Sequence, residues 1–276
     1  AGHFGLVRTS FEGFQTQPFQ KGSSDAYTLT VAFWVKSAKT GNYVLELFDT
    51  DNSRQISKIY TISSANTWEK KILNFAADTS ASDPFTYDNA ESFVMNWWLG
   101  AGSTYSGGTL NTSAWADNTN ANRAAGVLNL ADSTDNDWYL TGVQLEFGTF
   151  DENSLPKFQF ESYGDNLKRC QRYCQKYTQP PLVGIANANN TYARAKMLLQ
   201  TPMRAAPTAT HSGTLNYFVS NSIQPTTTAF SATYLDENVV EFDATTNVTS
   251  MTAKDPITCT QNGSGFLLLT ADLMAG

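Results

Sequence analysis

The side chains best suited to chemistry in this chain are aromatic and small polar residues gathered between Gly100 and Gly126. Six of them, together with a tryptophan on the apolar run before them, form the candidate binding set: Tyr105, Trp115, Asp117, Asn118, Asn120, Arg123 and Trp97. Aromatic rings stack on the apolar faces of sugars, while amide, carboxylate and guanidinium groups bond to sugar hydroxyls. Long irregular loops inside compact domains are often functional. The stretch is therefore a candidate glycan-binding loop, although for Trp115 itself we favour the interpretation that its ring packs its own loop onto the sandwich.

Trp97 and Trp98 are consecutive residues of one apolar run. Because successive side chains of a strand point to opposite faces, we expect one of them in the core and the other free to be exposed.

Residues for hydrolytic catalysis are sparse. The chain has two histidines, His3 and His211, and neither lies near a nucleophile motif. No metalloprotease motif, phosphate-binding loop or paired-cysteine motif is present. We therefore expect a protein without catalytic activity, although a glycan-degrading enzyme stays open because two carboxylates could meet in the fold.

Acidic residues cluster at 49–51, 132–137 and 151–152. Aspartates in solvated turns bond to their own backbone, and this is the interpretation we favour. The alternative is a structural Ca²⁺ site, since hard cations take clustered loop oxygens. No other cofactor is expected.

The three cysteines are Cys170, Cys174 and Cys259. An odd, sparse count is unlike a disulfide-stapled module and suits synthesis in a reducing cytoplasm. Cys170 and Cys174 are four residues apart on an expected helix, a spacing that could ligate a metal. Buried thiols that pack this helix against the sandwich are the favoured interpretation, and no zinc is expected.

Composition and charge narrow the function classes. Of the 276 residues 16% are charged and 13% aromatic, with a net charge of −7 and a pI near 4.8. An acidic chain lacks the positive field that gathers nucleic-acid phosphates, and no apolar stretch is long enough to insert into a bilayer. The excess of Thr, Ser, Asn and Gly is typical of short strands joined by polar turns.

Alternating apolar residues predict the strands of a first domain over residues 1–160. In residues 27–35 every second side chain is large and apolar, and a turn at 40–42 then leads into another run, which indicates a hairpin or adjacent strands. Further strands are expected at 55–62, 68–75, 93–99 and 138–148. In the last, Tyr139, Val143, Leu145 and Phe147 share one parity. This spacing predicts a jelly-roll or β-sandwich domain.

One helix is expected, at 165–177, within a connecting segment 161–180 that Pro180 and Pro181 end. Beyond it, residues 181–276 predict a smaller β-rich domain with strands at 193–200, 215–219, 229–235, 239–242 and 265–271. The last strand is apolar on both faces, so we expect it inside the small domain or against a neighbouring subunit. The predicted fold is all-β.

Three motifs in order carry a family resemblance. Residues 139–148 read YLTGVQLEFG, residues 167–173 read LKRCQRY after the aromatic segment FQFESY, and residues 201–208 read TPMRAAPT. This series resembles a signature of phage tail-fibre and virion-associated receptor-binding proteins. Residues 27–41 also look like the opening strand of the carbohydrate-binding-module-like jelly roll that often precedes it.

The resemblance implies a bacteriophage virion structural protein, made in the host cytoplasm. We expect it to be the distal, receptor-binding part of a tail fibre that attaches to host-surface glycan. The partners so implied are the glycan, other tail or capsid proteins and two further copies of the chain in a homotrimer. The alternative is a capsid or tail decoration protein that binds no sugar.

Overall fold

The computed structural model describes residues 2–178, 180–186, 192–213, 216–219, 227–246, 253–260 and 265–273. It divides into two compact units, one built from Ala1–Gln159 and the other from Phe160–Asp272. Within these residues the strands form four sheets, all strand pairs are antiparallel, and the helices are few and short. The predicted all-β fold class is confirmed.

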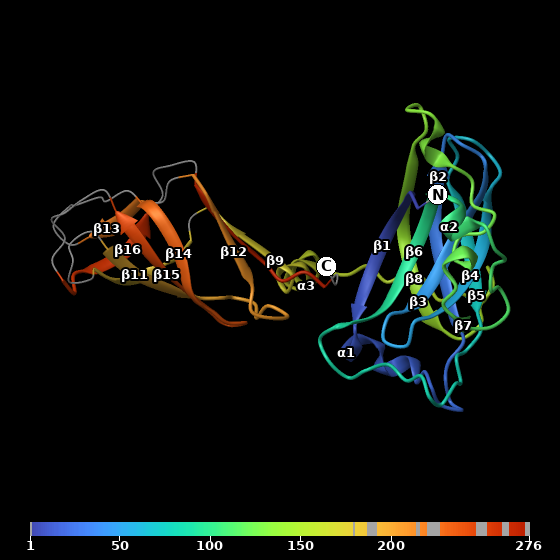
Figure 1. The fold of residues 1–276 in the computed structure, drawn as a ribbon, viewed down its shortest axis with the longest axis horizontal. Helices are drawn as coiled ribbons and strands as arrows, with labels where there is room; N and C mark the ends of the chain where they lie inside the picture. The colour runs from blue at the N-terminus through green and yellow to red at the C-terminus, as the bar shows by residue number, and fades with distance from the viewer. Residues whose placement is uncertain are drawn as a thin grey trace. The chain divides into compact units, whose positions relative to one another are not determined.

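The first unit is a sandwich of two sheets (Figure 1). A five-stranded sheet has the order β1-β6-β3-β4-β7, and a three-stranded sheet has the order β5-β2-β8. The strand bounds are β1 (Phe4–Glu12), β2 (Leu29–Ser37), β3 (Gly41–Asp49), β4 (Arg54–Ile62), β5 (Glu69–Phe75), β6 (Glu91–Ala101), β7 (Ala116–Asp117) and β8 (Trp138–Phe147). Short helices lie between them: α1 (Gly13–Thr16), η1 (Gln17–Phe19), α2 (Ser103–Ser106), η2 (Asn120–Asn122) and η3 (Leu130–Asp132).

Strand β2 shows how the sequence builds the core. Val31, Phe33 and Val35 are fully buried between the sheets, as their alternation predicts. The intervening Trp34 and Lys36 consequently lie on the outer face of the three-stranded sheet. Burial of the odd-numbered residues thus fixes which residues that outer face presents.

The expected pairing of β2 with the next strand is wrong. β2 pairs with β5 and β8, whereas β3 pairs with β4 and β6 in the other sheet. The short connection crosses from one sheet to the other, and the hydroxyls of Ser37 and Tyr43 lie 3.0 Å apart across it. Both strands bury apolar side chains in the same core, which a crossing between sheets permits.

The shared parity expected in β8 is also wrong, because the strand contains a bulge. Trp138, Leu140, Val143 and Leu145 pack against the core, while Tyr139 is 46% exposed. The register of β8 against β2 shifts between Ala32 and Trp34, where Gly142 has a φ of +59°. The bulge inserts one extra residue into β8. Even-numbered side chains therefore point into the core before Gly142, and odd-numbered side chains do so after it.

The second unit consists of α3 (Tyr163–Gln171) and two sheets. Its strands are β9 (Cys174–Tyr177), β10 (Val183–Ala186), β11 (Tyr192–Leu198), β12 (Thr208–Ser212), β13 (Asn216–Val219), β14 (Thr227–Leu235), β15 (Val239–Thr246), β16 (Pro256–Thr260) and β17 (Phe266–Thr270). The sheet orders are β13-β16-β10-β11-β15-β14 and β12-β17-β9. β17 lies between two strands with Leu267 and Leu269 fully buried, so the unit itself covers much of this apolar strand.

Among the described residues, no helix has the length and apolarity needed to cross a bilayer.

The predicted helix is shorter than expected. The Ser162 side chain caps its start by accepting from the Asp165 backbone N–H, and the helix ends at Gln171. Cys174 begins a strand that pairs with β17, so Cys170 and Cys174 do not share a helix. Both thiols are exposed, and the expectation that they pack the helix against the sandwich is wrong. The side chain of Cys259 lies outside the described part of the chain.

Candidate ligand-binding face

Trp115, the central residue of the predicted glycan site, is part of the core. Its side chain is 8% exposed and belongs to the buried cluster between the sheets. The indole N–H donates to the Ala76 carbonyl at 2.9 Å, and the Lys21 ammonium lies 5.8 Å from the ring centroid. A buried ring cannot stack on a sugar, so Trp115 is the anchor of its loop.

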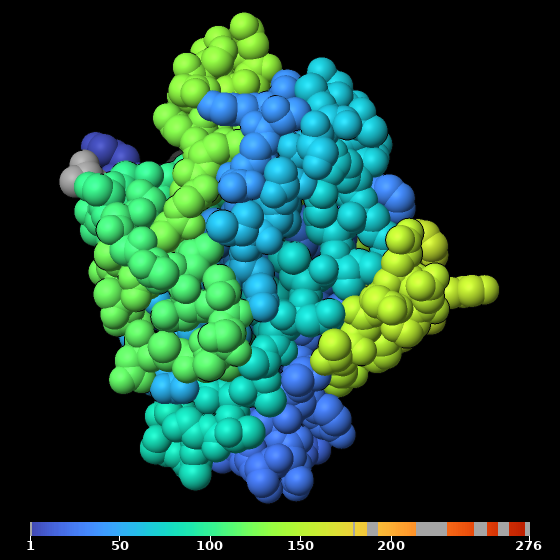
Figure 2. Space-filling model, turned by 90° about the vertical axis from the view of Figure 1, so that its right-hand side faces the viewer, coloured from blue at the N-terminus to red at the C-terminus, as the bar shows by residue number. Residues whose placement is uncertain are grey.

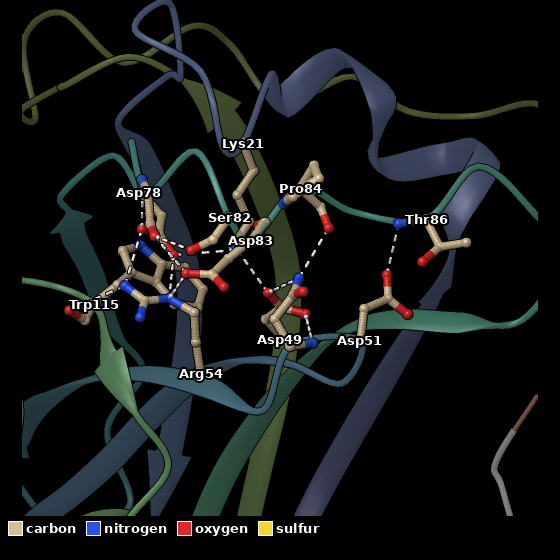
Figure 3. Close-up of polar contacts among 12 residues, drawn as sticks. Lys21, Asp49, Asp51, Arg54, Asp78, Ser82, Asp83, Pro84, Thr86 and Trp115 are labelled. Atoms are coloured by element: carbon tan, nitrogen blue, oxygen red, sulfur yellow. Dashed lines mark hydrogen bonds and ion pairs between the residues drawn. The ribbon is translucent and has the colours of Figure 1, made fainter.

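A network of charges lies beside this ring and is drawn in Figure 3. The Lys21 ammonium, only 4% exposed, is 2.6 Å from the Asp49 carboxylate and 3.2 Å from that of Asp78. The Arg54 guanidinium is 2.8 Å from Asp78 and 2.9 Å from Asp117. The network ties strands β3 and β4 to the loop at 78–83 and to the short strand β7, which holds Asp117. Asp117 is thereby engaged in an ion pair.

Burial alone would raise the pKa of the Asp78 carboxyl. Hydrogen bonds and the positive charges of Arg54 and Lys21 outweigh this effect, so the pKa of Asp78 lies below its usual value. The carboxylate form is what holds the two cations in place.

Arg123 is bound to a buried carboxylate. Its Nε and one terminal nitrogen donate to the two oxygens of Glu46 at 2.7 and 3.0 Å, and Glu46 is fully buried. The same carboxylate accepts from the Asn96 amide and from the Trp98 indole, each at 2.9 Å. Arg123 therefore fastens its loop onto the five-stranded sheet.

That loop covers the outer face of the sheet. Trp98, Val44 and Ala124 form a buried cluster, against which Tyr105 and Leu110 pack. Trp97, on the opposite face of β6, is buried in the main core, so both tryptophans are buried and the expectation that one is free to be exposed is wrong. The reason is the loop itself, which supplies a second apolar layer.

The structure therefore does not assemble the predicted site as a ligand surface. Trp97, Trp115 and Arg123 hold the fold, and Tyr105 packs against the Trp98 ring at 5.5 Å. Asn118 and Asn120 remain near the surface, with their amide groups 3.5 Å apart.

The acidic clusters are also engaged within the protein. Asp49 pairs with Lys21, Asp132 pairs with Lys39, and Asp151 accepts backbone N–H groups of Asn153 and Ser154. Hydrogen bonds from Ser154 and its neighbours hold the pKa of Asp151 below its usual value. In the part of the chain that the structure describes, no three His, Cys, Asp or Glu residues are arranged to hold a metal ion.

Exposed aromatic side chains gather instead on the outer face of the three-stranded sheet. Trp34 is 43% exposed, Trp68 41% and Tyr139 46%. The rings of Trp68 and Tyr139 are 6.4 Å apart, and the Lys36 ammonium lies 4.4 Å from the Tyr139 centroid and 5.6 Å from that of Trp68. We call Trp34, Trp68 and Tyr139 the aromatic platform.

Register places the platform residues together. Lys36 pairs with Tyr139 on one side of β2, and Trp34 pairs with Thr141 on that side and with Lys70 on the other. Gly142 leaves space for Trp34, because a Cβ atom at that position would lie 3.2 Å from the indole ring. The bulge in β8 thus both turns Tyr139 outward and makes room for Trp34.

The other end of the same face is covered by the chain that follows β8, which is yellow-green to yellow in Figure 2. The Asn74 amide donates to the Phe150 carbonyl and the Gln144 amide to the Pro156 carbonyl, each at 3.0 Å. Thr30, on the β2 strand beneath, is fully buried. The platform is the part of this face that stays open to solvent.

The sequence carries a signal for one residue of the platform, Trp34. Trp34 stands at the parity opposite to Val31, Phe33 and Val35, so a large ring is placed where a half-buried strand usually has a polar side chain. Trp68 and Tyr139 could not be grouped with it, because strand pairing and the bulge were unknown.

A hollow of about 580 Å³ lies at the end of β1 and β6 and is lined by residues that include His3, Phe4 and Asn129. The Asn129 side chain accepts from the Ala131 backbone N–H, and the Asn136 amide donates to the Leu130 carbonyl. These amides stabilise their own loop. The hollow therefore offers a ligand fewer aromatic side chains than the platform does.

Comparison with known proteins assigns no family to the chain: no protein-family model matches it, and neither does any curated protein sequence.

Proposed function

We propose that this protein is a bacteriophage virion component, the distal receptor-binding part of a tail fibre, and that it adheres to host-surface glycan through the aromatic platform. The observation that carries the proposal is the group of three exposed rings on one sheet face. Exposed apolar patches are unfavourable in water and typically mark a surface that a ligand or a partner covers. The motifs at 139–148, 167–173 and 201–208 supply the virion context as a resemblance.

The platform suits a sugar chain better than a small buried ligand. It lies on an open sheet face, where rings offer stacking surface and Lys36 and Lys70 offer hydrogen-bond donors. An open site encloses only one side of a ligand, so each site binds weakly. Several sites on one particle raise the overall avidity without any new contact, as a multimeric fibre would do.

The homotrimer remains part of the proposal. Its support is a set of exposed apolar side chains in the second unit: Val183 is 53% exposed, Ile185 51% and Leu198 77%. Exposed apolar side chains on neighbouring strands are typical of surfaces that other subunits cover. We assign the subunit contacts to this part of the chain, which leaves the platform to the ligand.

The test is binding of the full chain to intact bacterial cells from a panel of strains and to a glycan array, with a mass measurement of the assembly. The proposal predicts saturable binding by a trimer. No binding to any cell or glycan would contradict it and favour a capsid or tail decoration protein. New reducing ends in the polysaccharide after incubation would instead indicate a glycan-degrading enzyme.

A further inference from the structure

The aromatic platform carries positive charge in an acidic protein. Lys36 lies between Trp68 and Tyr139, and Lys70 lies directly across from Trp34 on the neighbouring strand. Neither lysine forms an ion pair with a carboxylate within the described residues. The chain as a whole has a net charge of −7, so this face differs in sign from the molecule that bears it.

The carboxylates closest in sequence and register to these lysines are engaged by other groups. Glu69 is 2.6 Å from the Lys71 ammonium and accepts the backbone N–H groups of Ser63 and Ser64. Asp137 accepts the Ala38 backbone N–H at 2.8 Å. Glu146 accepts from the Gln144 amide at 2.7 Å, towards the end of the face that the following chain covers. The two ammonium groups therefore keep their charge available to a ligand.

The geometry at Lys36 combines stacking surface with a charge. The Lys36 ammonium lies over the Tyr139 ring, 4.4 Å from its centroid, and over the Trp68 ring, 5.6 Å from its centroid, and is attracted to both. A sugar would therefore contact the parts of these rings that the ammonium leaves uncovered. A carboxylate on that sugar could accept a charge-assisted hydrogen bond from Lys36 while its ring contacts Tyr139 or Trp68. A neutral sugar would gain the stacking alone.

We infer that the aromatic platform selects acidic saccharides, in which a carboxylate on the sugar pairs with Lys36 and is attracted by Lys70. The inference rests on the proposed glycan binding and names the class of glycan. The rings supply the contact area, and the two lysines supply the preference for charge. Screening by salt must weaken that preference, because both lysines lie at a solvent-open face.

The experiment uses the 276-residue chain on an array in which each uronic-acid saccharide is spotted beside its carboxyl-reduced, neutral form. We expect about tenfold tighter binding to the acidic member of a pair, with the difference shrinking at high salt. Lys36→Gln should lose most of the preference, leaving only the attraction by Lys70, whereas Lys36→Arg should keep it. Lys168→Gln, which removes the same charge from an exposed position in α3, should bind like the wild type.

The outcomes separate the two proposals. Equal binding of the wild type to acidic and reduced forms would overturn the inference and leave glycan binding intact. So would a Lys36→Gln protein that keeps the preference. Absence of binding to every saccharide on the array and to every strain in the panel would overturn the proposed function, and the inference with it.

Discussion

At the scale of single residues, Gly142 decides what the outer face presents. Its φ of +59° lies in the left-handed region, which glycine adopts without the steric cost that a side chain brings, and it sits where the β8 register shifts against β2. A side chain there would meet the ring of Trp34. One residue therefore sets both the bulge and the position of a platform ring.

Replacement of this glycine is a direct test of that role. We expect Gly142→Val to lower the free energy of unfolding by about 1 to 3 kcal/mol, from backbone strain, and to weaken glycan binding as Trp34 shifts. Chemical denaturation and array binding measure the two effects. Gly164→Ala is the control, since its position in α3 has open space and no positive φ, and it should lose neither stability nor binding. A Gly142→Val protein as stable as the wild type would contradict the bulge argument.

Trp115 provides a second test at this scale. Because its ring fills the core and its N–H bonds to Ala76, Trp115→Ala should destabilise the first unit by about 3 to 5 kcal/mol. Glycan binding by the protein that remains folded should be unchanged. Chemical denaturation measures the loss of stability, and a separate binding assay at a low temperature, where the variant stays folded, measures glycan binding. Loss of binding without loss of stability would return Trp115 to the site.

The residue scale also shows what the sequence could and could not predict. Alternation in β2 placed Val31, Phe33 and Val35 in the core correctly, because a half-buried strand imposes its period directly on its residues. Loop composition made Trp115 a candidate ligand contact, while packing of its ring onto the sandwich was the favoured interpretation, and the buried ring confirms the packing. Which role it takes depends on where the loop packs, and this is a long-range property.

At the scale of elements, the loop that covers the five-stranded sheet depends on one buried carboxylate. Glu46 has no exposed surface and binds the Arg123 guanidinium through both oxygens. Removal of the cation alone would leave a buried charge with only the Asn96 and Trp98 donors. The pair is therefore one of the contacts that keep the loop docked, beside the Ser57 backbone N–H that donates to the Asn111 carbonyl.

We expect Arg123→Met to cost about 3 to 5 kcal/mol of unfolding free energy and to open the loop to proteolysis. The double variant Glu46→Gln with Arg123→Met should recover part of that loss, because no unpaired charge remains buried. Denaturation and limited proteolysis of the four proteins of this double-mutant cycle measure the coupling. Additive effects of the two substitutions would contradict it.

The ion pairs of Asp78 with Lys21 and Arg54 should make the free energy of unfolding depend on pH. The pKa of Asp78 is lower in the folded state than in the unfolded chain, where it is about 3.9. The stabilisation that the Asp78 carboxylate gives to the folded state is therefore fully present above the unfolded pKa. It is lost as the pH falls through the pKa of the folded state. Asp78→Asn should be less stable at neutral pH and should lose less stability than the wild type below about pH 4. Urea denaturation across pH measures this, and parallel curves for the two proteins would contradict it.

Elements were predicted unevenly, for a physical reason. Strand β2 is predicted because its large apolar residues recur with a fixed period, whereas β6 is predicted as a continuous apolar run and is buried on both faces. The segment at 174–177 continued a helical spacing but forms β9, because pairing with β17 offers backbone hydrogen bonds from far along the chain. The crossing between β2 and β3 likewise depends on which sheet completes the core.

At the scale of the whole molecule, each unit has a buried core of its own. The first centres on residues such as Phe33 and Trp97, and the second on residues such as Phe242 and Leu267. Units of this kind can fold separately. We expect a fragment of residues 1–159 to fold as a monomer and to keep the glycan preference at lower avidity, because the proposed subunit contacts lie in the second unit. Circular dichroism, mass and array binding of the fragment test this, and a fragment that forms trimers would contradict the assignment of contacts.

The central claim is that the aromatic platform binds host glycan, and the most direct measurement compares Trp34→Ala with Tyr87→Ala in binding to intact cells. Tyr87 is 73% exposed and packs against Phe14 away from the platform, so its loss removes a similar ring without touching the site. The account predicts that Trp34→Ala binds about tenfold more weakly or worse, while Tyr87→Ala binds like the wild type. Equal binding by both variants and the wild type would contradict it.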